Sequence, residues 1–328
     1  MRFDLRWLWL GLLPFIVYSI FFLVFEELRP SGLVFPLAKN PDSLTIGAAE
    51  AYRRYFWLSA FAVAGAVAAA VTFSAIMTMR RGLVQGNRAA IYGVALVAIA
   101  IMAVVEIFSG AERWYTHLGD GLFQSVFGTG KAYGELSRLE VLDAGLDVIK
   151  WLGMIALILL TLCLVLTLAR PASADMPDEE HAQHLAAAAK TQRALLLHLT
   201  AVYVVAIVAM FAWMMWPMPY LADEAAKAAY RDVVNGAAIL QAVGYSLGTA
   251  AIYLPAAMVL RQRAMTLAGR MAGQTDAGLT GANADDWLAR MGLAASPVDQ
   301  FRQTATLALP VLVSLAPAVG DLLGTAVK

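Results

Sequence analysis

The chain has 328 residues, of which 60% are hydrophobic and 15% charged, and its mean hydropathy is +0.67. About a quarter of the residues of a soluble domain are charged, so this composition excludes an ordinary soluble protein. The 24 Lys and Arg residues balance the 24 Asp and Glu residues, which leaves no basic excess for binding nucleic acid. The single cysteine, Cys163, excludes an intramolecular disulfide.

Six apolar runs predict the fold. A helix needs about 20 apolar residues to cross about 30 Å of hydrocarbon, and the runs reach or approach that length. We expect an all-α, polytopic helical membrane protein whose six transmembrane helices form three hairpins. The predicted spans cover residues 7–25, 56–79, 89–108, 151–169, 195–217 and 236–260.

The first run follows Arg2 and Arg6, as a secretory signal would. Its apolar stretch is longer than the 7 to 15 residues typical of a signal peptide, and no small-residue cleavage site follows it, so we interpret it as a retained span. Residues 29–54 contain three prolines and predict an irregular, exposed connection.

The second span carries small residues at every fourth position. Ala62, Ala66 and Ala70 share one helix face, and small residues let two helix backbones approach closely in a membrane. We expect this face to pack against another helix of the chain or, alternatively, to mediate dimerisation. The Leu-rich fourth span is expected to face lipid by contrast.

Three ionisable residues lie in or near the predicted spans. Glu106 near the end of the third span and Lys150 at the start of the fourth belong to one hairpin, which predicts an ion pair or, alternatively, a cation or proton site. His198 lies near one end of the fifth span, where it is expected to snorkel or to bond a neighbouring helix rather than to relay protons.

The fifth and sixth runs are expected to belong to longer helices. Pro177 and the three acidic residues after it predict a helix start, and no residue breaks the pattern before Pro217. The sixth helix is expected to continue beyond Leu260 to Met271. Together these extensions, including residues 177–194, would form a stalk on the cytoplasmic side.

Two further patterns concern packing inside the membrane. Gly244 and Gly248 form a GxxxG motif in the sixth span, which predicts close packing within the chain or, alternatively, dimerisation. Pro14 and Pro255 interrupt the first and sixth spans. Such prolines predict kinks, or the broken helices of a substrate site.

Residues 261–328 are expected to form a cytoplasmic, membrane-associated tail, separate from the six-span domain of residues 1–260. A short helix is predicted around Trp287, and a later apolar stretch contains Pro310 and Pro317. That stretch is too short and too broken to span easily, so we expect it to be interfacial, re-entrant or buried against protein. These three residues are the candidate contacts of the tail.

The basic residues are concentrated in one set of short loops, which predicts that both termini lie in the cytoplasm and that the protein resides in the cell inner (plasma) membrane. These residues are Arg2, Arg6, Arg80, Arg81, Arg88, Arg170, Lys190, Arg193, Arg261 and Arg263.

Motifs of soluble chemistry are weak. Gly128 to Lys131 lacks the earlier glycine and the Ser or Thr of a phosphate loop, and Ser125 has no nucleophile-elbow pattern. We therefore expect no catalytic residue, cofactor or metal site.

The function expected from these patterns is that of a non-enzymatic membrane assembly or effector component. Its partners would be the lipid bilayer and either further copies of the chain or a cytoplasmic protein docked by the stalk and tail, with no nucleic acid. The alternative is an oligomeric channel or membrane-perturbing effector, and a small-solute transporter ranks third.

Overall fold

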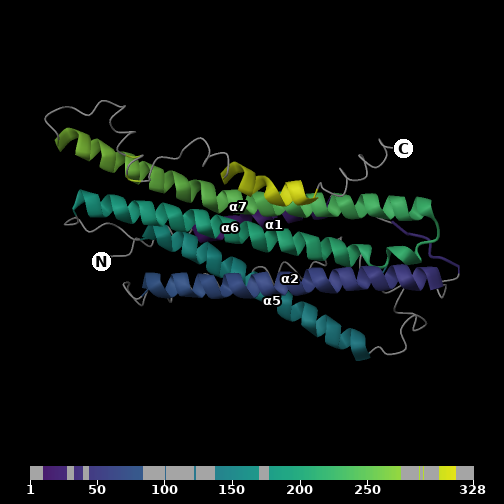
Figure 1. Ribbon diagram of the computed structural model, residues 1–328. Coiled ribbons are helices and arrows are strands. Elements are labelled where there is room, and N and C mark those ends of the chain that lie inside the picture. Colours follow the sequence, from purple (N-terminus) through teal and green to yellow (C-terminus); the bar gives the residue numbers. More distant parts are fainter. Residues whose placement is uncertain are drawn as a thin grey trace.

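The computed structural model is an elongated bundle of helices (Figure 1). It describes residues 10–27, 33–39, 44–83, 137–169, 177–274 and 303–314, and the single residues 100, 122, 288 and 291. The labelled elements are α1 (Leu13–Glu27), α2 (Leu44–Leu83), α5 (Ser137–Ala169), α6 (Asp178–Met215), the short 3-10 helix η2 (Met218–Tyr220) and α7 (Glu224–Gln274). A further apolar helix, Gln303–Ser314, is called the C-terminal helix below and is yellow in Figure 1. The predicted all-α class is confirmed.

In the part of the chain that the structure describes, four helices are long and apolar enough to cross a membrane: α2, α5, α6 and α7. The predicted multi-pass helical character is thus supported, whereas the count of six spans is not confirmed. The first predicted span forms α1, whose 15 residues extend only about 22 Å at 1.5 Å per residue. The third predicted span, residues 89–108, lies outside the described residues apart from residue 100.

Contacts between helices define the direction of each one. Gly65 and Ala75 of α2 lie against Ile149 and Cys163 of α5, so α2 and α5 run parallel. Helices α6 and α7 are antiparallel to each other and are joined by residues 216–223, which we call the turn end of the bundle. At the opposite end, residues 178–193 of α6 and 261–274 of α7 form what we call the stalk end.

Several helix boundaries follow the sequence prediction. Helix α6 begins at Asp178, directly after Pro177, and ends at Met215, two residues before Pro217. Helix α7 continues through the stalk end to Gln274 and contains Pro255. The expected helical extensions of both apolar runs are therefore present.

Other boundaries differ from the prediction. Helix α2 begins at Leu44, so the second half of the connection expected to be irregular is helical. Side chains in the first turns of α2 form hydrogen bonds with the turn end, as described below. These tertiary contacts explain why the helix begins earlier than predicted. Pro14 is the second residue of α1 and follows a 3-10 segment at residues 10–12, within the apolar helix Leu10–Phe21. Proline suits the first turn of an α-helix, because the N–H groups of that turn have no α-helical partner.

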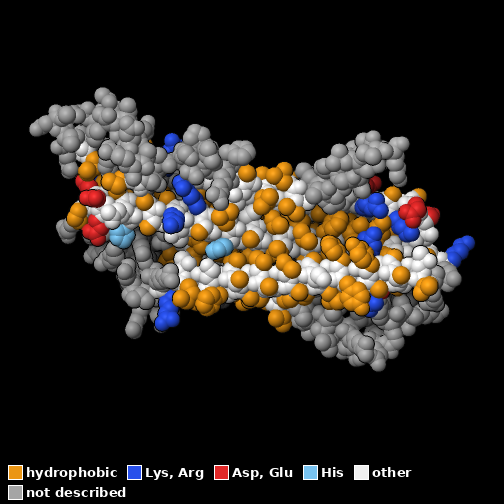
Figure 2. Space-filling view, in the orientation of Figure 1, with side chains coloured by type: hydrophobic (Ala, Val, Ile, Leu, Met, Phe, Trp, Pro, Cys, Tyr) orange, Lys and Arg blue, Asp and Glu red, His pale blue; other side chains and the backbone are white. Residues whose placement is uncertain are grey.

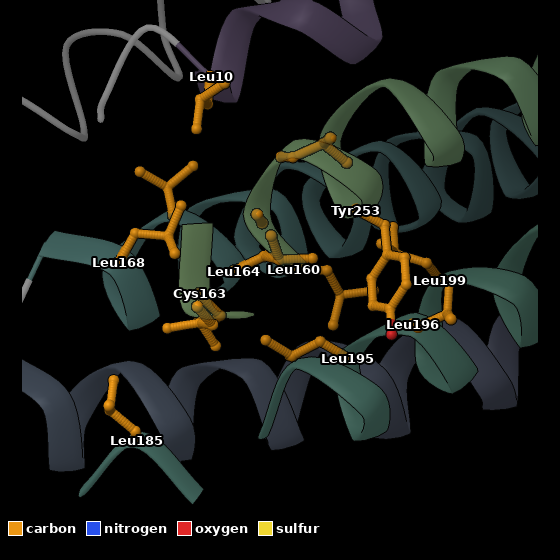
Figure 3. Packing of buried hydrophobic residues seen from close by; sticks show 14 of the residues in the cluster. Leu10, Leu160, Cys163, Leu164, Leu168, Leu185, Leu195, Leu196, Leu199 and Tyr253 are labelled. Atoms are coloured by element: carbon orange, nitrogen blue, oxygen red, sulfur yellow. The ribbon is translucent and has the colours of Figure 1, made fainter. Parts of the chain in front are cut away.

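The main core lies where α5 meets α6 and α7 (Figure 3). Leu160, Leu164 and Leu168 of α5 are fully buried and share one apolar cluster with Leu196 of α6 and Tyr253 of α7. Of the apolar stretch of α5, 56% is buried, the largest share among the four candidate spans. The expectation that this Leu-rich helix faces lipid was wrong. In a membrane, leucine suits a helix contact as well as a lipid contact, so hydropathy does not separate the two.

Within the described chain, helix α2 packs through a different face from the one that carries the predicted small residues. Ala62, Ala66 and Ala70 are exposed in the described bundle. The buried side chains recur at intervals of three, four or seven residues, which places them on one face of the helix. They are Trp57, Ala64, Ala68, Val71 and Ala75.

Candidate functional site in the membrane core

Three tyrosines from three helices form one stack inside the bundle. The ring of Tyr245 on α7 lies 5.6 Å from that of Tyr18 on α1 and 4.2 Å from that of Tyr203 on α6, with interplanar angles of 9° and 19°. Each ring buries a large apolar surface and carries a hydroxyl group. We call Tyr18, Tyr203, Tyr245 and the adjoining Gln241 the tyrosine cluster.

Gln241 links two of the helices by a hydrogen bond. Its side-chain amide Nε2 donates to the Tyr18 hydroxyl at 2.8 Å, and the glutamine is only 2% exposed. A polar group without a partner is costly in hydrocarbon, so this bond favours the observed position of α1 against α7.

The GxxxG motif lies beside the cluster and faces α1. A Cβ atom on Gly244 would lie 2.9 Å from Phe21 Cε1, and one on Gly248 would lie 3.4 Å from the Pro14 carbonyl oxygen. Both glycines are buried. Within the chain, the small residues therefore let α1 approach the α7 backbone, which is the first of the two uses that the sequence predicts.

Other predicted residues lie apart from this cluster. Lys150 is exposed on α5, and its expected partner Glu106 lies outside the described residues, as do Trp287 and Pro317. His198 is partly buried, and its Nδ1 atom has no hydrogen-bond partner among the described residues. The structure does not bring His198 together with another predicted ionisable residue in the described part of the chain.

A second polar cluster joins α2 to the turn end. The buried Glu50 carboxylate accepts a hydrogen bond from Trp216 Nε1 and lies 3.2 Å from the Arg54 guanidinium. The Arg53 guanidinium donates to the Met215 carbonyl oxygen at 3.2 Å.

These contacts complete a helix end that is shielded from water. The Tyr230 hydroxyl donates to the Met214 carbonyl at 2.6 Å, so both carbonyls at the end of α6 accept side-chain bonds. The last carbonyls of a helix lack partners within it and need such donors when they are buried. Residues 33–39 cover the same turn through an antiparallel bridge between Leu37 and Leu221.

Sequence reasoning missed both clusters because none of their residues forms a known motif. The signal available was the occurrence of Tyr18, Tyr203, Gln241 and Tyr245 within otherwise apolar runs, since buried polar groups in a membrane need partners. Glu50 lay in a segment expected to be an exposed connection, so its burial was not anticipated.

Comparison with known proteins gives no family. No family model, curated protein or solved structure matches the chain. The chemistry of the site therefore rests on its own residues. Tyrosine hydroxyls and a glutamine amide supply hydrogen bonds and stacking surface, and no three His, Cys, Asp or Glu side chains of the described part are placed to hold a metal ion.

Proposed function

We propose that the protein is a non-enzymatic assembly component of the membrane, which docks a cytoplasmic protein through its stalk end. The observation that carries this proposal is the packed extension of α6 and α7 beyond their apolar runs. At 1.5 Å per residue, the 38 residues of α6 and the 51 of α7 extend about 57 Å and about 76 Å, well beyond about 30 Å of hydrocarbon.

The stalk end has an apolar inside and a charged outside. Ala182 and Leu185 of α6 are buried in the same cluster as Leu267 and Ala268 of α7. The exposed side chains include Glu179, Glu180, Lys190, Arg261 and Arg270. A rigid helix pair with charges of both signs is suited to a polar protein partner, because complementary charges set orientation and specificity.

The proposed topology has six spans, with both termini in the cytoplasm of the inner membrane. The parallel course of α2 and α5 supports it, because the chain must return across the bundle between Leu83 and Ser137. The apolar run at residues 89–108 has the length for one such crossing. Arg80, Lys190 and Arg261 flank the apolar stretches at the stalk end, which favours the cytoplasm for that end.

Copurification in mild detergent tests the docking proposal. The stalk variant Glu179→Gln/Glu180→Gln is compared with Glu224→Gln/Asp232→Asn, which removes two exposed acids near the turn end. We expect a stoichiometric partner to remain with the wild type and the control and to be depleted from the stalk variant. Equal retention in all three proteins, or the absence of any stoichiometric partner, contradicts the proposal.

The tyrosine cluster favours a second candidate, an oligomeric channel, because polar side chains inside a membrane often line a conducting path. Reconstitution of the pure protein in planar bilayers separates the two candidates. The docking proposal expects no single-channel current, whereas a reproducible current favours the channel.

A further inference from the structure

The C-terminal helix lies along the bundle, level with the apolar stretches of α6 and α7 (Figure 1). Near its start, the Thr306 carbonyl oxygen accepts a hydrogen bond from the Thr200 hydroxyl of α6 at 3.3 Å. Farther along, Val311 packs against a cluster that contains Ile207 of α6. Because the residue numbers rise together on the two helices, the C-terminal helix runs in the same direction as α6, from the stalk end toward the turn end.

This helix is too short to cross the membrane. Its residues, Gln303–Ser314, extend about 18 Å at 1.5 Å per residue, against about 30 Å of hydrocarbon. Thr200 lies in the stalk-side half of the apolar run 195–217 of α6, and Ile207 lies near the middle of that run. The C-terminal helix therefore covers the stalk-side half of the run. The sequence predicts a break at Pro310, whereas the helix continues through it to Ser314.

The two faces of the C-terminal helix are the reverse of those of a helix in water. Three positions with small or polar residues are buried: Thr306, Pro310 and Ser314. The exposed positions are Thr304 near the start and then Leu309 and Leu312, which are 41% and 56% exposed. A surface helix of a soluble protein buries its apolar side chains and turns polar or charged ones to water. This helix has no charged residue, and its outward face is suited to hydrocarbon.

Polar groups of the buried face have partners within the protein. The Ser314 hydroxyl donates to the Val311 carbonyl oxygen at 2.8 Å, and the Thr200 hydroxyl donates to the Thr306 carbonyl oxygen. Polar groups in hydrocarbon need such partners, because no water is present to replace them. Neither bond requires water, so this face is compatible with a position inside the membrane.

We propose that the C-terminal helix is a half-membrane segment, which enters the hydrocarbon from the stalk end and presents Leu309 and Leu312 to lipid acyl chains. Acyl chains are the partner that fits this face, because the face is apolar and uncharged and lies level with the apolar run of α6. Of the positions that the sequence allows for this stretch, the proposal selects insertion into the hydrocarbon. It rests on the membrane assignment of α6 and α7 and is independent of any cytoplasmic partner.

Spin labels on single cysteines test the depth of the helix in the full-length protein. The protein is reconstituted in phosphatidylcholine and phosphatidylglycerol vesicles in a Cys163→Ala background. Electron paramagnetic resonance then compares collisions with oxygen, which concentrates in hydrocarbon, and with a water-soluble nickel complex. The labelled variants carry cysteine at the three exposed positions of the helix: Thr304→Cys, Leu309→Cys and Leu312→Cys.

Two exposed positions outside the C-terminal helix provide matched controls. Leu247→Cys lies in the apolar stretch of α7, two residues after Tyr245, whose ring stacks on Tyr203 of α6 between Thr200 and Ile207. It therefore lies at about the depth expected for the C-terminal helix. Gln262→Cys lies on α7 at the stalk end and reports a position outside the hydrocarbon.

The labels at Leu309→Cys and Leu312→Cys should collide mainly with oxygen, as should Leu247→Cys, whereas Gln262→Cys should collide mainly with nickel. Depth should increase from Thr304→Cys to Leu312→Cys by about 12 Å, because the eight intervening steps of a helix along the bundle axis rise about 1.5 Å each.

Three outcomes overturn the proposal. Nickel contact at Leu309→Cys and Leu312→Cys as frequent as at Gln262→Cys would place the helix in water. Equal depths at all three labelled positions of the helix would mean that it lies flat at the membrane surface. Frequent nickel contact at Leu247→Cys would mean that the stretch of α7 beside the helix does not lie in the membrane.

Discussion

At the scale of single residues, two glycines allow close contacts between helices, because a side chain of a neighbouring helix occupies the space next to the position of the absent Cβ atom. Gly244 accommodates the edge of the Phe21 ring, and Gly65 accommodates the end of the Ile149 side chain at 3.0 Å from its ideal Cβ position. In lipid, helices associate through close packing and hydrogen bonds, without the hydrophobic driving force available in water. A single added methyl group therefore tests a helix contact directly.

The first prediction ranks three Gly→Ala substitutions. Gly244→Ala should destabilise the protein by about 1–3 kcal/mol, because the rigid Phe21 ring lies 2.9 Å from the new methyl group. Gly248→Ala should be nearly neutral at 3.4 Å, and Gly153→Ala, with no atom within 4 Å, should be neutral or stabilising. Thermal unfolding in detergent measures the order, and equal midpoints for Gly244→Ala and Gly153→Ala would contradict the contact between α1 and α7.

A second prediction concerns the buried carboxylate of the turn end. Glu50→Ala should cost about 1–3 kcal/mol, because both the Trp216 indole N–H and the Arg54 guanidinium lose an acceptor. Glu50→Gln should cost less, since its amide oxygen still accepts one bond. The exposed Glu224, paired with Lys227, provides the control, and Glu224→Ala should change stability by less than about 0.5 kcal/mol. Unfolding midpoints that are the same for Glu50→Ala and Glu224→Ala would show that the cluster is not a stabilising element.

At the scale of helices, sequence reasoning succeeded where a boundary has a chemical signal. The start of α6 after Pro177 and its end before Pro217 were predicted because proline cannot continue a helix at its end and suits its beginning. The start of α2 at Leu44 was not predicted, because it depends on Glu50 and Arg53 reaching the turn end, which is distant in sequence.

The choice of packing face was also beyond the sequence. In α2 the exposed positions Ala62 and Ala66 and the buried positions Ala64 and Ala68 carry the same residue type. Small side chains permit the close approach of another helix, but they do not determine which helix packs there. In α5 the same ambiguity applies to leucine, and only the tertiary contacts identify the buried side.

A third prediction compares two truncations on α5. Leu164 is completely buried, whereas Ile155 is 38% exposed on the same helix. Leu164→Ala should destabilise by about 2–5 kcal/mol through the cavity that it leaves, and Ile155→Ala should cost clearly less because lipid or detergent replaces the lost contact. Thermal unfolding of both variants provides the measurement. A larger loss in Ile155→Ala would mean that α5 presents its opposite side to the core.

At the scale of the whole molecule, the distribution of charged side chains along the bundle defines three zones, an apolar middle and two charged ends. Figure 2 shows apolar side chains along its middle and charged side chains toward its two ends. The turn end joins α2, α6 and α7 through Glu50, Trp216 and Tyr230, while the stalk end consists of α6 and α7 packed together. If the bundle axis lies along the membrane normal, the two ends lie on opposite sides of the membrane. The accessibility of each end to a chemical label then reports the topology.

The last prediction tests this arrangement with single cysteines in a Cys163→Ala background. Lys39→Cys and Asp223→Cys lie at exposed positions near the turn end, and Arg80→Cys, Glu180→Cys and Gln262→Cys lie at exposed positions toward the stalk end. In intact cells, a membrane-impermeant maleimide should label the first two, because basic flanking residues favour the cytoplasm for the stalk end.

The remaining three cysteines should react only after the membrane is permeabilised. Labelling of Arg80→Cys on the same side as Lys39→Cys would mean that α2 does not cross the membrane. Complete reversal of the pattern would leave the bundle axis in place but put the stalk end outside, where a cytoplasmic partner has no access to it. The proposed docking function requires the first pattern, since the charged faces of α6 and α7 act there only if they lie in the cytoplasm.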